Sequence, residues 1–175
     1  GKILFSDRPH AEIISIDTSE ALALAGVKTV ITAADAPDKT YGIYIHDKRV
    51  FAKNRVLHAG QPVAAVAAES EEIAYQAVRL IRVTYQDLPA VFNIEDALAG
   101  DAFPIHPELP SYFKTYPYNQ YGNVFMDARI EQGDPSLAFA QADIVLEETY
   151  NMPAVHQAPL EPHASQTVLG FHDLP

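Results

Sequence analysis

The chain has 175 residues, 48% of them hydrophobic, and its 23 acidic and 12 basic residues give a formal net charge of −11. This hydrophobic fraction allows a folded core, and the acidic balance excludes the clustered Lys and Arg of a nucleic-acid-binding surface. The sequence contains no Cys, which excludes disulfides, iron–sulfur ligation by this chain and a Cys nucleophile.

The sequence has no apolar run of membrane-spanning length, and residues 1–8 lack the hydrophobic region of a signal peptide. These features predict a cytoplasmic protein that binds neither a membrane nor a nucleic acid. The first residue is Gly1 and not Met, as expected for a segment of a longer protein.

Strands and short helices alternate at the start of the chain. Residues 11–17 are predicted to form a mostly buried strand, and a polar residue within 17–19 then caps a helix over 20–25. Gly26 suits the left-handed position that ends a helix. A second strand over residues 27–32 follows directly.

The next segment begins with turn-forming residues and a short strand at 41–45. Gly60-Gln61-Pro62 is interpreted as a bend before a core strand, since it has neither a glycine-rich phosphate loop nor a following Lys. Ser70 is predicted to cap a helix with acidic residues in its first turn and apolar residues on one face. A strand at 82–85 and a helical turn at 94–98 complete this part.

A change of composition separates the two ends of the chain. Residues 100–122 alternate prolines with tyrosines and phenylalanine, which predicts an irregular connection held against a surface. Beyond it we expect a strand over 123–132, a helix opened by Asp134 and Pro135, and a strand over 143–150.

Strands outnumber helices and the connections are irregular, so the predicted fold class is α+β and not a doubly wound sheet. The predicted domains are residues 1–99, a Pro/Tyr-rich linker at 100–122, and the beginning of a second domain at 123–175.

The segment 155–164 concentrates polar side chains among apolar residues. His156, Glu161 and His163 are of the types that ligate zinc. Two prolines within the segment exclude the regular helix that a His-Glu-x-x-His zinc motif requires. The sequence therefore predicts no metal site here, and a His/Glu metal hydrolase is kept only as a third hypothesis.

Glu161 allows a second interpretation. A carboxyl group buried in an apolar pocket would have a raised pKa and could exchange a hydrogen bond with a heterocycle nitrogen or a carbonyl. The alternative, favoured by spacing alone, is a buried Glu whose oxygens are satisfied by backbone groups or by an Arg. The other histidines stand singly and are interpreted as surface or hydrogen-bonded core side chains, among them His10, His46, His58 and His106.

Several runs of residues, in order along the chain, resemble one known family, the xanthine dehydrogenase and aldehyde oxidase family. The runs similar to its α/β-hammerhead domain are Arg8-Pro9-His10-Ala11-Glu12-Ile13, Ile16-Asp17, Gly26-Val27, Thr32-Ala33-Ala34-Asp35-Ala36-Pro37, Gly60-Gln61-Pro62-Val63-Ala64-Ala65-Val66 and Val83-Thr84-Tyr85-Gln86-Asp87-Leu88-Pro89-Ala90-Val91. Those similar to the start of its molybdopterin-binding domain are Ile130-Glu131-Gln132-Gly133-Asp134, Phe139-Ala140-Gln141-Ala142-Asp143, Tyr150 and the segment from His156 to His163.

The resemblance implies a molybdenum hydroxylase, which inserts a water-derived oxygen into a carbon–hydrogen bond of an aldehyde or N-heterocycle. Such an enzyme holds molybdopterin (the molybdenum cofactor) in its large subunit. Its electrons leave through iron–sulfur clusters and often FAD, carried on other domains or subunits that are the expected partners. A homo-oligomer is also compatible with the family.

The resemblance also implies a role for one residue. Glu161, in Leu160-Glu161-Pro162-His163, stands where the family has a Glu that lines the substrate pocket. The family's catalytic base and pterin contacts would follow Pro175, so residues 1–175 are expected to lack both, to bind no cofactor and to be inactive alone. The alternative is a free-standing hammerhead scaffold, or a module that docks partner subunits, without catalysis.

Overall fold

The computed structural model describes residues 1–117 and 119–161. The chain divides into two compact units, Gly1–Ile130 (unit 1) and Glu131–Pro175 (unit 2). Unit 1 contains two three-stranded sheets and a strand hairpin, and every strand pairing in the described residues is antiparallel. The fold is α+β, as the order of elements predicts.

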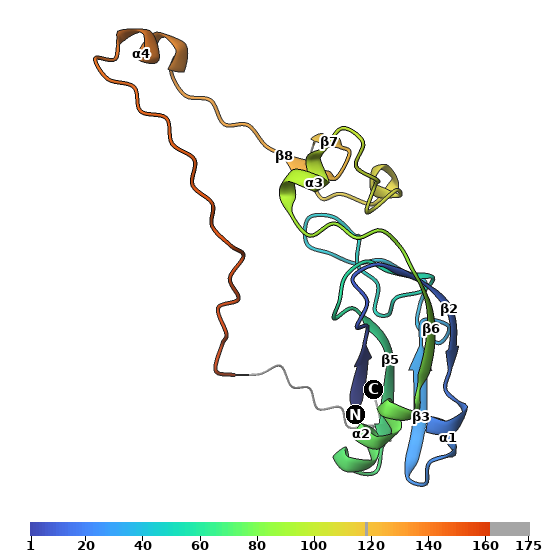
Figure 1. Ribbon diagram of the computed structural model, residues 1–175. Coiled ribbons are helices and arrows are strands. Elements are labelled where there is room, and N and C mark those ends of the chain that lie inside the picture. The colour runs from blue at the N-terminus through green and yellow to red at the C-terminus, as the bar shows by residue number, and fades with distance from the viewer. Residues whose placement is uncertain (118, 162–175) are drawn as a thin grey trace, which may run out of the picture. The chain divides into compact units, whose positions relative to one another are not determined.

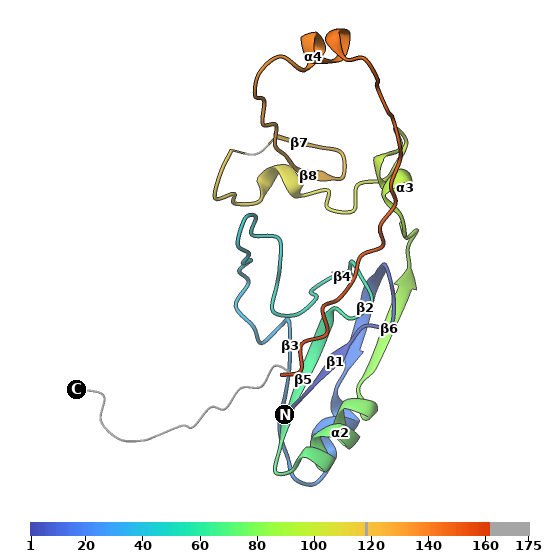
Figure 2. The same cartoon turned by 90° about the vertical axis from the view of Figure 1, so that its left-hand side faces the viewer.

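The first sheet has the order β1-β5-β3 and the second the order β4-β2-β6. Figure 1 and Figure 2 show both sheets in the part of unit 1 that contains the N-terminus. The bounds are β1 Lys2–Phe5, β2 Ala11–Asp17, β3 Val27–Thr32, β4 Arg55–Val56, β5 Pro62–Ala68 and β6 Arg82–Asp87. The strand β1 is absent from the sequence-based prediction, because four residues are too few to show an alternating pattern.

Two short helices, α1 (Ser19–Ala23) and α2 (Glu71–Leu80), lie at the same end of unit 1 (Figure 1). The side-chain oxygen of Ser70 accepts a hydrogen bond from the backbone N–H of Ile73 at 3.2 Å, which confirms the predicted cap. The small side chains of Ala74 and Ala77 are fully buried and let α2 approach the first sheet closely.

The turn after α1 depends on glycine. Gly26 has a φ of +88°, a conformation that other residues rarely adopt, and an added Cβ would lie 2.7 Å from the side chain of Ile73. The predicted left-handed conformation of Gly26 is thus confirmed, but α1 ends at Ala23, before the predicted helix end, because Leu24 is already extended. The close contact with Ile73 shows that the turn after α1 packs against α2.

The core of unit 1 consists of two apolar clusters of small and medium side chains. One lies between α1, α2 and the first sheet and includes Val30 and Val66. The other includes Val56 and Val63, the largest fully buried side chains among the described residues. Ile16 packs against both clusters, so the two sheets share one continuous core.

The remainder of unit 1 is short irregular structure tied by side chains. It contains α3 (Ile94–Leu98), a 3-10 helix η1 (Leu109–Ser111), β7 (Asn119–Tyr121) and β8 (Val124–Asp127). Asn123, between the two strands, donates to the carbonyls of Ala97 and Phe103 and accepts from the N–H of Ile105. These bonds hold the Pro/Tyr-rich segment in place, as predicted, and the predicted domain limits at 99 and 122 stay a prediction.

Two strand predictions differ from the structure in this region. Residues 41–45 form only isolated bridges, Tyr41 with Lys48 and Ile45 with Lys114. The strand expected over 123–132 is instead the β7–β8 hairpin, which ends at Asp127. Both differences concern segments with few buried apolar residues, where local propensity decides little.

Unit 2 contains the helix α4 (Pro135–Gln141), capped as predicted by Asp134, whose Oδ1 accepts from the N–H of Leu137 at 2.9 Å. The strand predicted over 143–150 is wrong: these residues are exposed and have no regular structure. A strand needs a neighbouring edge, and among residues 131–161 there is no other strand to supply one.

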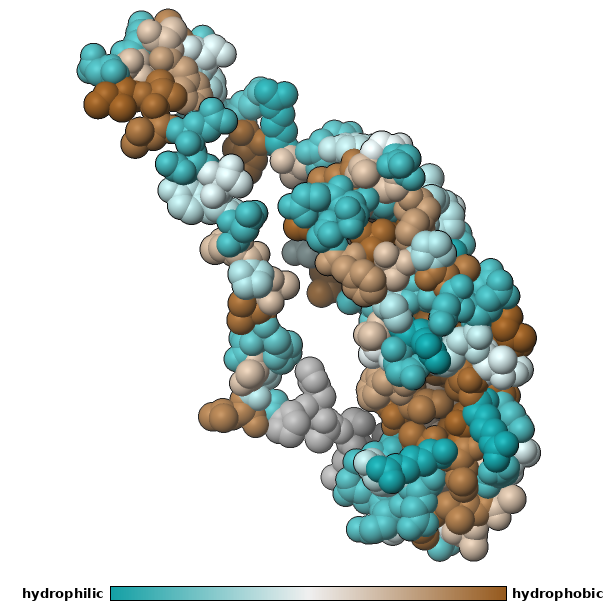
Figure 3. Space-filling view, in the orientation of Figure 1, coloured by the Kyte–Doolittle hydropathy of each residue, from teal (hydrophilic) through white to brown (hydrophobic). Residues whose placement is uncertain are grey.

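Apolar side chains are exposed on the surface of both units. Figure 3 shows them gathered over the sheets of unit 1 and, separately, on the helix of unit 2. They include Ile3, Phe5 and Ile31 of the first sheet and Leu137 and Phe139 of α4. Within the described part of the chain, no helix is long and apolar enough to cross a membrane.

Candidate functional site

Glu161 is the last described residue, and its side chain is exposed. The residue before it, Leu160, is fully exposed as well. The apolar pocket expected around this carboxyl group is not formed by residues 131–161, all of which are exposed. The role of Glu161 in a substrate pocket therefore stays a prediction.

Of the two histidines in the same segment, the structure describes His156. His156 accepts a hydrogen bond at Nδ1 from the N–H of Ala158 at 3.0 Å, which stabilises a local turn in which Ala158 has a φ of +46°. His163 lies outside the described residues. Residues 1–117 and 119–161 contain no group of three or more His, Asp or Glu side chains able to hold a metal ion.

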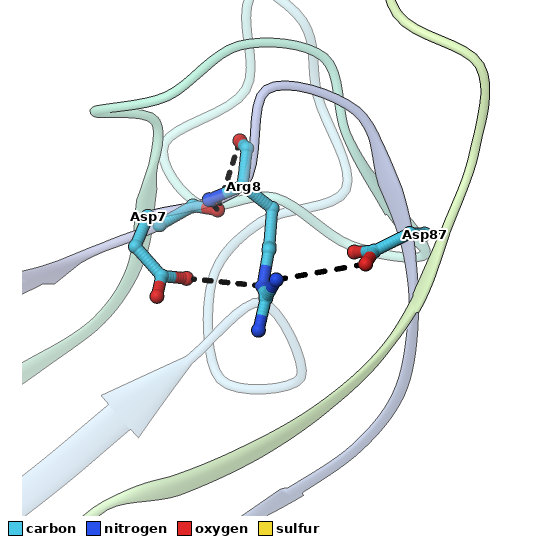
Figure 4. Close-up of polar contacts among 4 residues, drawn as sticks. Asp7, Arg8 and Asp87 are labelled. Carbon is cyan, nitrogen blue, oxygen red and sulfur yellow. Dashed lines mark hydrogen bonds and ion pairs between the residues drawn. The ribbon is translucent and has the colours of Figure 1, made fainter.

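In unit 1 the structure joins the first and the last of the residue runs that resemble the hammerhead domain. Arg8 forms ion pairs with Asp7 at 3.4 Å and with Asp87 at 3.5 Å, as Figure 4 shows. The Oγ of Ser6, a buried residue, accepts from the backbone N–H of Arg8 at 3.0 Å. These contacts fix the corner between β1 and β2 against the end of β6.

His10 is part of the same corner. It is 7% exposed, and its Nδ1 lies 2.5 Å from the carbonyl oxygen of Pro89, while its own carbonyl accepts from the N–H of Leu88 at 3.0 Å. The interpretation of His10 as a hydrogen-bonded core histidine is confirmed. Its Nε2 is buried and has no hydrogen-bond partner among the described residues.

The Gly60-Gln61-Pro62 bend lies beside the end of β1 and leads into β5. Gly60, with a φ of +85°, donates to the carbonyl of Ser6 at 2.7 Å, and the N–H of Ser6 donates to the carbonyl of Gln61 at 2.9 Å. The side-chain Oε1 of Gln61 accepts from the N–H of Leu57 at 2.7 Å. This confirms the interpretation as a bend and places Gln61 on the wall of a cavity.

The cavity beside this bend has a volume of about 560 Å³ and lies entirely within unit 1. We call it the Arg55 cavity, after the arginine of β4 on its wall. Its lining is mostly polar and comprises Glu12, Ile13, Thr40, Asp47, Arg49, Ala52, Lys53, Asn54, Arg55, Leu57, Gln61, Glu108 and Tyr112. Sequence reasoning missed it because these residues come from separate segments, although the density of Lys and Arg in residues 39–55 is a visible signal.

Tyr112, on the wall of this cavity, contacts His106: the Tyr112 hydroxyl lies 3.2 Å from Nδ1 of His106. Burial lowers the pKa of His106 and raises the pKa of Tyr112. Both pKa shifts widen the pH range over which the imidazole and the phenol are neutral. Lys53 and Arg49, also on the wall, hold the pKa of Asp38 below its usual value.

The comparisons with known families agree on both parts of the chain. The family model "Aldehyde oxidase and xanthine dehydrogenase, a/b hammerhead domain" matches residues 1–89, and the model "Molybdopterin cofactor-binding domain" matches residues 116–172. Both matches follow the order in which the sequence resemblance placed these domains.

Curated relatives and solved structures give the same result. The chain is 39% identical to a probable xanthine dehydrogenase component of Bacillus subtilis over 87% of its length, and 36% identical to the probable hypoxanthine oxidase XdhD of Escherichia coli K12 over 93%. It spans only 19% and 20% of these relatives. The aldehyde oxidoreductase of Desulfovibrio gigas matches 82% of the chain with a TM-score of 0.62 and 29% identity, over 16% of its own length.

Proposed function

Because this chain belongs to the aldehyde oxidase and xanthine dehydrogenase family, we propose that it works within the large, molybdopterin-binding subunit of a molybdenum hydroxylase. In this proposal unit 1 supplies the hammerhead domain, and the following residues supply the beginning of the molybdopterin-binding domain. The matches of the two family models, in this order, are the observation that carries the proposal.

The proposed reaction is the oxidative hydroxylation of an N-heterocycle or an aldehyde. The names of the bacterial relatives refer to xanthine and hypoxanthine, which supports a purine or similar heterocycle as the substrate class. The electrons would pass to iron–sulfur clusters and FAD on other domains or subunits. The lack of Cys supports this division, since this chain cannot ligate an iron–sulfur cluster with thiolates.

The described residues do not form a binding site for molybdopterin on their own. Residues 131–161 are all exposed, so they offer neither an enclosed cradle nor a buried donor for the pterin. We therefore assign no cofactor contact and no catalytic base to residues 1–161, and the proposed complete enzyme supplies both from other parts.

Glu161 is the one residue of this chain to which we assign a role toward the substrate. Its carboxyl group would lie on the wall of the substrate pocket and exchange a hydrogen bond with a ring nitrogen or carbonyl of the substrate. The match of the molybdopterin cofactor-binding model to residues 116–172, which include Glu161, is what supports this assignment. Its contribution is orientation of the substrate and a hydrogen bond that strengthens as charge develops there.

The test is Glu161→Gln in the complete enzyme, with steady-state kinetics on hypoxanthine and on benzaldehyde. Glu148→Gln, which removes another exposed carboxylate of unit 2, is the matched control. We expect Glu161→Gln to lower kcat/KM for hypoxanthine by roughly 10-fold or more, with the unfolding midpoint and the control unchanged.

Two results would contradict the proposal at different levels. Equal kinetics for Glu161→Gln and the unsubstituted enzyme would remove the role of Glu161 but leave the enzyme assignment intact. A complete protein without stoichiometric molybdenum and without turnover on either substrate would favour the scaffold alternative.

A further inference from the structure

We propose that the Arg55 cavity is a binding site for a small oxyanion, a ligand bearing a phosphate or carboxylate group. The cavity has about 560 Å³, which is within the size range of small-molecule sites. The proposed role of Glu161 makes no use of it, and both family models and the names of the relatives leave it without a function.

The wall of the cavity offers three basic side chains, Arg49, Lys53 and Arg55, that an oxyanion could contact. Residues 39–55 contain five of the 12 Lys and Arg residues of the chain and a single carboxylate, Asp47. Asp38, one residue before this segment, forms ion pairs with Arg49 and Lys53 and offsets part of this positive charge.

Arg55 differs from the other cations on the wall in the length of its ion pair. Arg49 and Lys53 form close ion pairs with Asp38, the second at 2.7 Å. The ion pair of Arg55 with Glu108 has a distance of 3.8 Å, well beyond the length of a charge-assisted hydrogen bond. The Arg55 side chain is 28% exposed, so its guanidinium is held at the cavity without a short partner from Glu108.

Two neutral amides add hydrogen-bond donors to the wall. Asn54 and Gln61 both line the cavity. Because the side-chain oxygen of Gln61 is engaged by the N–H of Leu57, its amide nitrogen remains as a donor. The planar guanidinium of Arg55 can bind a carboxylate or phosphate through two parallel hydrogen bonds, and the amides of the same wall can add further donors.

The wall also carries carboxylates, which set a condition on binding. Glu12, Asp47 and Glu108 line the cavity with Arg49, Lys53 and Arg55, so the opposite charges are equal in number. An oxyanion that binds at Arg55 competes with the Glu108 carboxylate for the guanidinium. Removal of the Glu108 charge should therefore strengthen binding, whereas removal of the Arg55 charge should weaken it.

The experiment is isothermal titration calorimetry of the intact protein with inorganic phosphate and, separately, with succinate. An ionic strength of about 20 mM keeps the screening of charges by salt weak. The variants are Arg55→Gln, Glu108→Gln and the control Lys28→Gln. Lys28 is a cation of unit 1 that is paired with Glu69 and does not line the cavity.

We expect saturable binding of at least one of the two anions. Arg55→Gln should raise the Kd by about 10-fold or more, Glu108→Gln should lower it by about 3-fold or more, and Lys28→Gln should leave it unchanged. The gain in Glu108→Gln cannot result from misfolding, which keeps the test valid if Arg55→Gln destabilises β4. No saturable binding of either anion, or equal affinities for Arg55→Gln and Lys28→Gln, would overturn the proposal.

Discussion

The imidazole of His10 stacks on the ring of Phe103, with 5.5 Å between the ring centroids and 7° between the planes. His10 precedes β2, whereas Phe103 belongs to the Pro/Tyr-rich segment after α3. This contact, with the bond from His10 to Pro89, fastens the segment to the sheets of unit 1.

His10→Ala should lower the free energy of unfolding by about 1–3 kcal/mol, because it leaves the carbonyl of Pro89 without its partner and removes the stacked ring. Phe103→Leu should cost less, since it removes only the aromatic part of the contact. Urea unfolding of both single variants and the double variant measures the coupling, expected at about 0.5–1.5 kcal/mol. Additive effects would show that the stack contributes no coupling energy.

Val63→Ala tests the shared core. Val63 is fully buried in the second apolar cluster, and loss of two methyl groups should cost about 2 kcal/mol through lost burial and the cavity left behind. Ile43→Ala is the control, because Ile43 is 82% exposed. Equal unfolding midpoints for the two variants would contradict the described core.

Gly42→Ala should disrupt the loop between β3 and β4. A Cβ at Gly42 would lie 1.8 Å from the backbone oxygen of Ile45, a distance that requires the backbone to move. We expect a loss of about 1–3 kcal/mol, in the range of local backbone strain. Thermal unfolding of the variant measures this loss. Gly100→Ala is the control and should be close to neutral in the same assay, because an added Cβ at Gly100 meets open space.

His106 should make stability depend on pH in a defined range. Burial lowers its pKa from the ordinary value of 6.5, so the unfolded chain takes up the proton at a higher pH than the folded chain does. Its contribution is complete above about pH 6.5 and is lost as the pH falls from there to the lower folded-state pKa. His106→Asn should reduce the slope of unfolding free energy between about pH 7 and about pH 5, and an unchanged slope would refute this assignment.

The sequence predicts most elements of unit 1 because their ends carry local signals. Ser70 in unit 1, and likewise Asp134 in unit 2, caps a helix through a contact with a residue three positions later, and Gly26 supplies the left-handed residue of the turn after α1. The strand expected over 143–150 was wrong because strand formation depends on a neighbouring edge and not on propensity alone.

Glu161 and the Arg55 cavity also differ in how far the sequence alone could predict them. The family resemblance, and not the spacing of the residues, singles out Glu161, and its place in a substrate pocket stays a prediction because residues 131–161 are all exposed. The Arg55 cavity could not be predicted, since Glu12, Gln61 and Glu108 approach one another only when the chain folds. A cluster of basic residues in the sequence indicates a charged surface, whereas a cavity requires the tertiary structure.

The distribution of basic residues also determines how trypsin can divide the chain. Arg129 is exposed, lies one residue before the end of unit 1, and is the last Lys or Arg in the sequence. Trypsin, which cleaves after Lys and Arg, can cut at the boundary between the two units but at no later position within residues 130–175. Cleavage after Arg129 therefore separates the residues that contain Glu161 from the hammerhead domain and leaves residues 130–175 uncut.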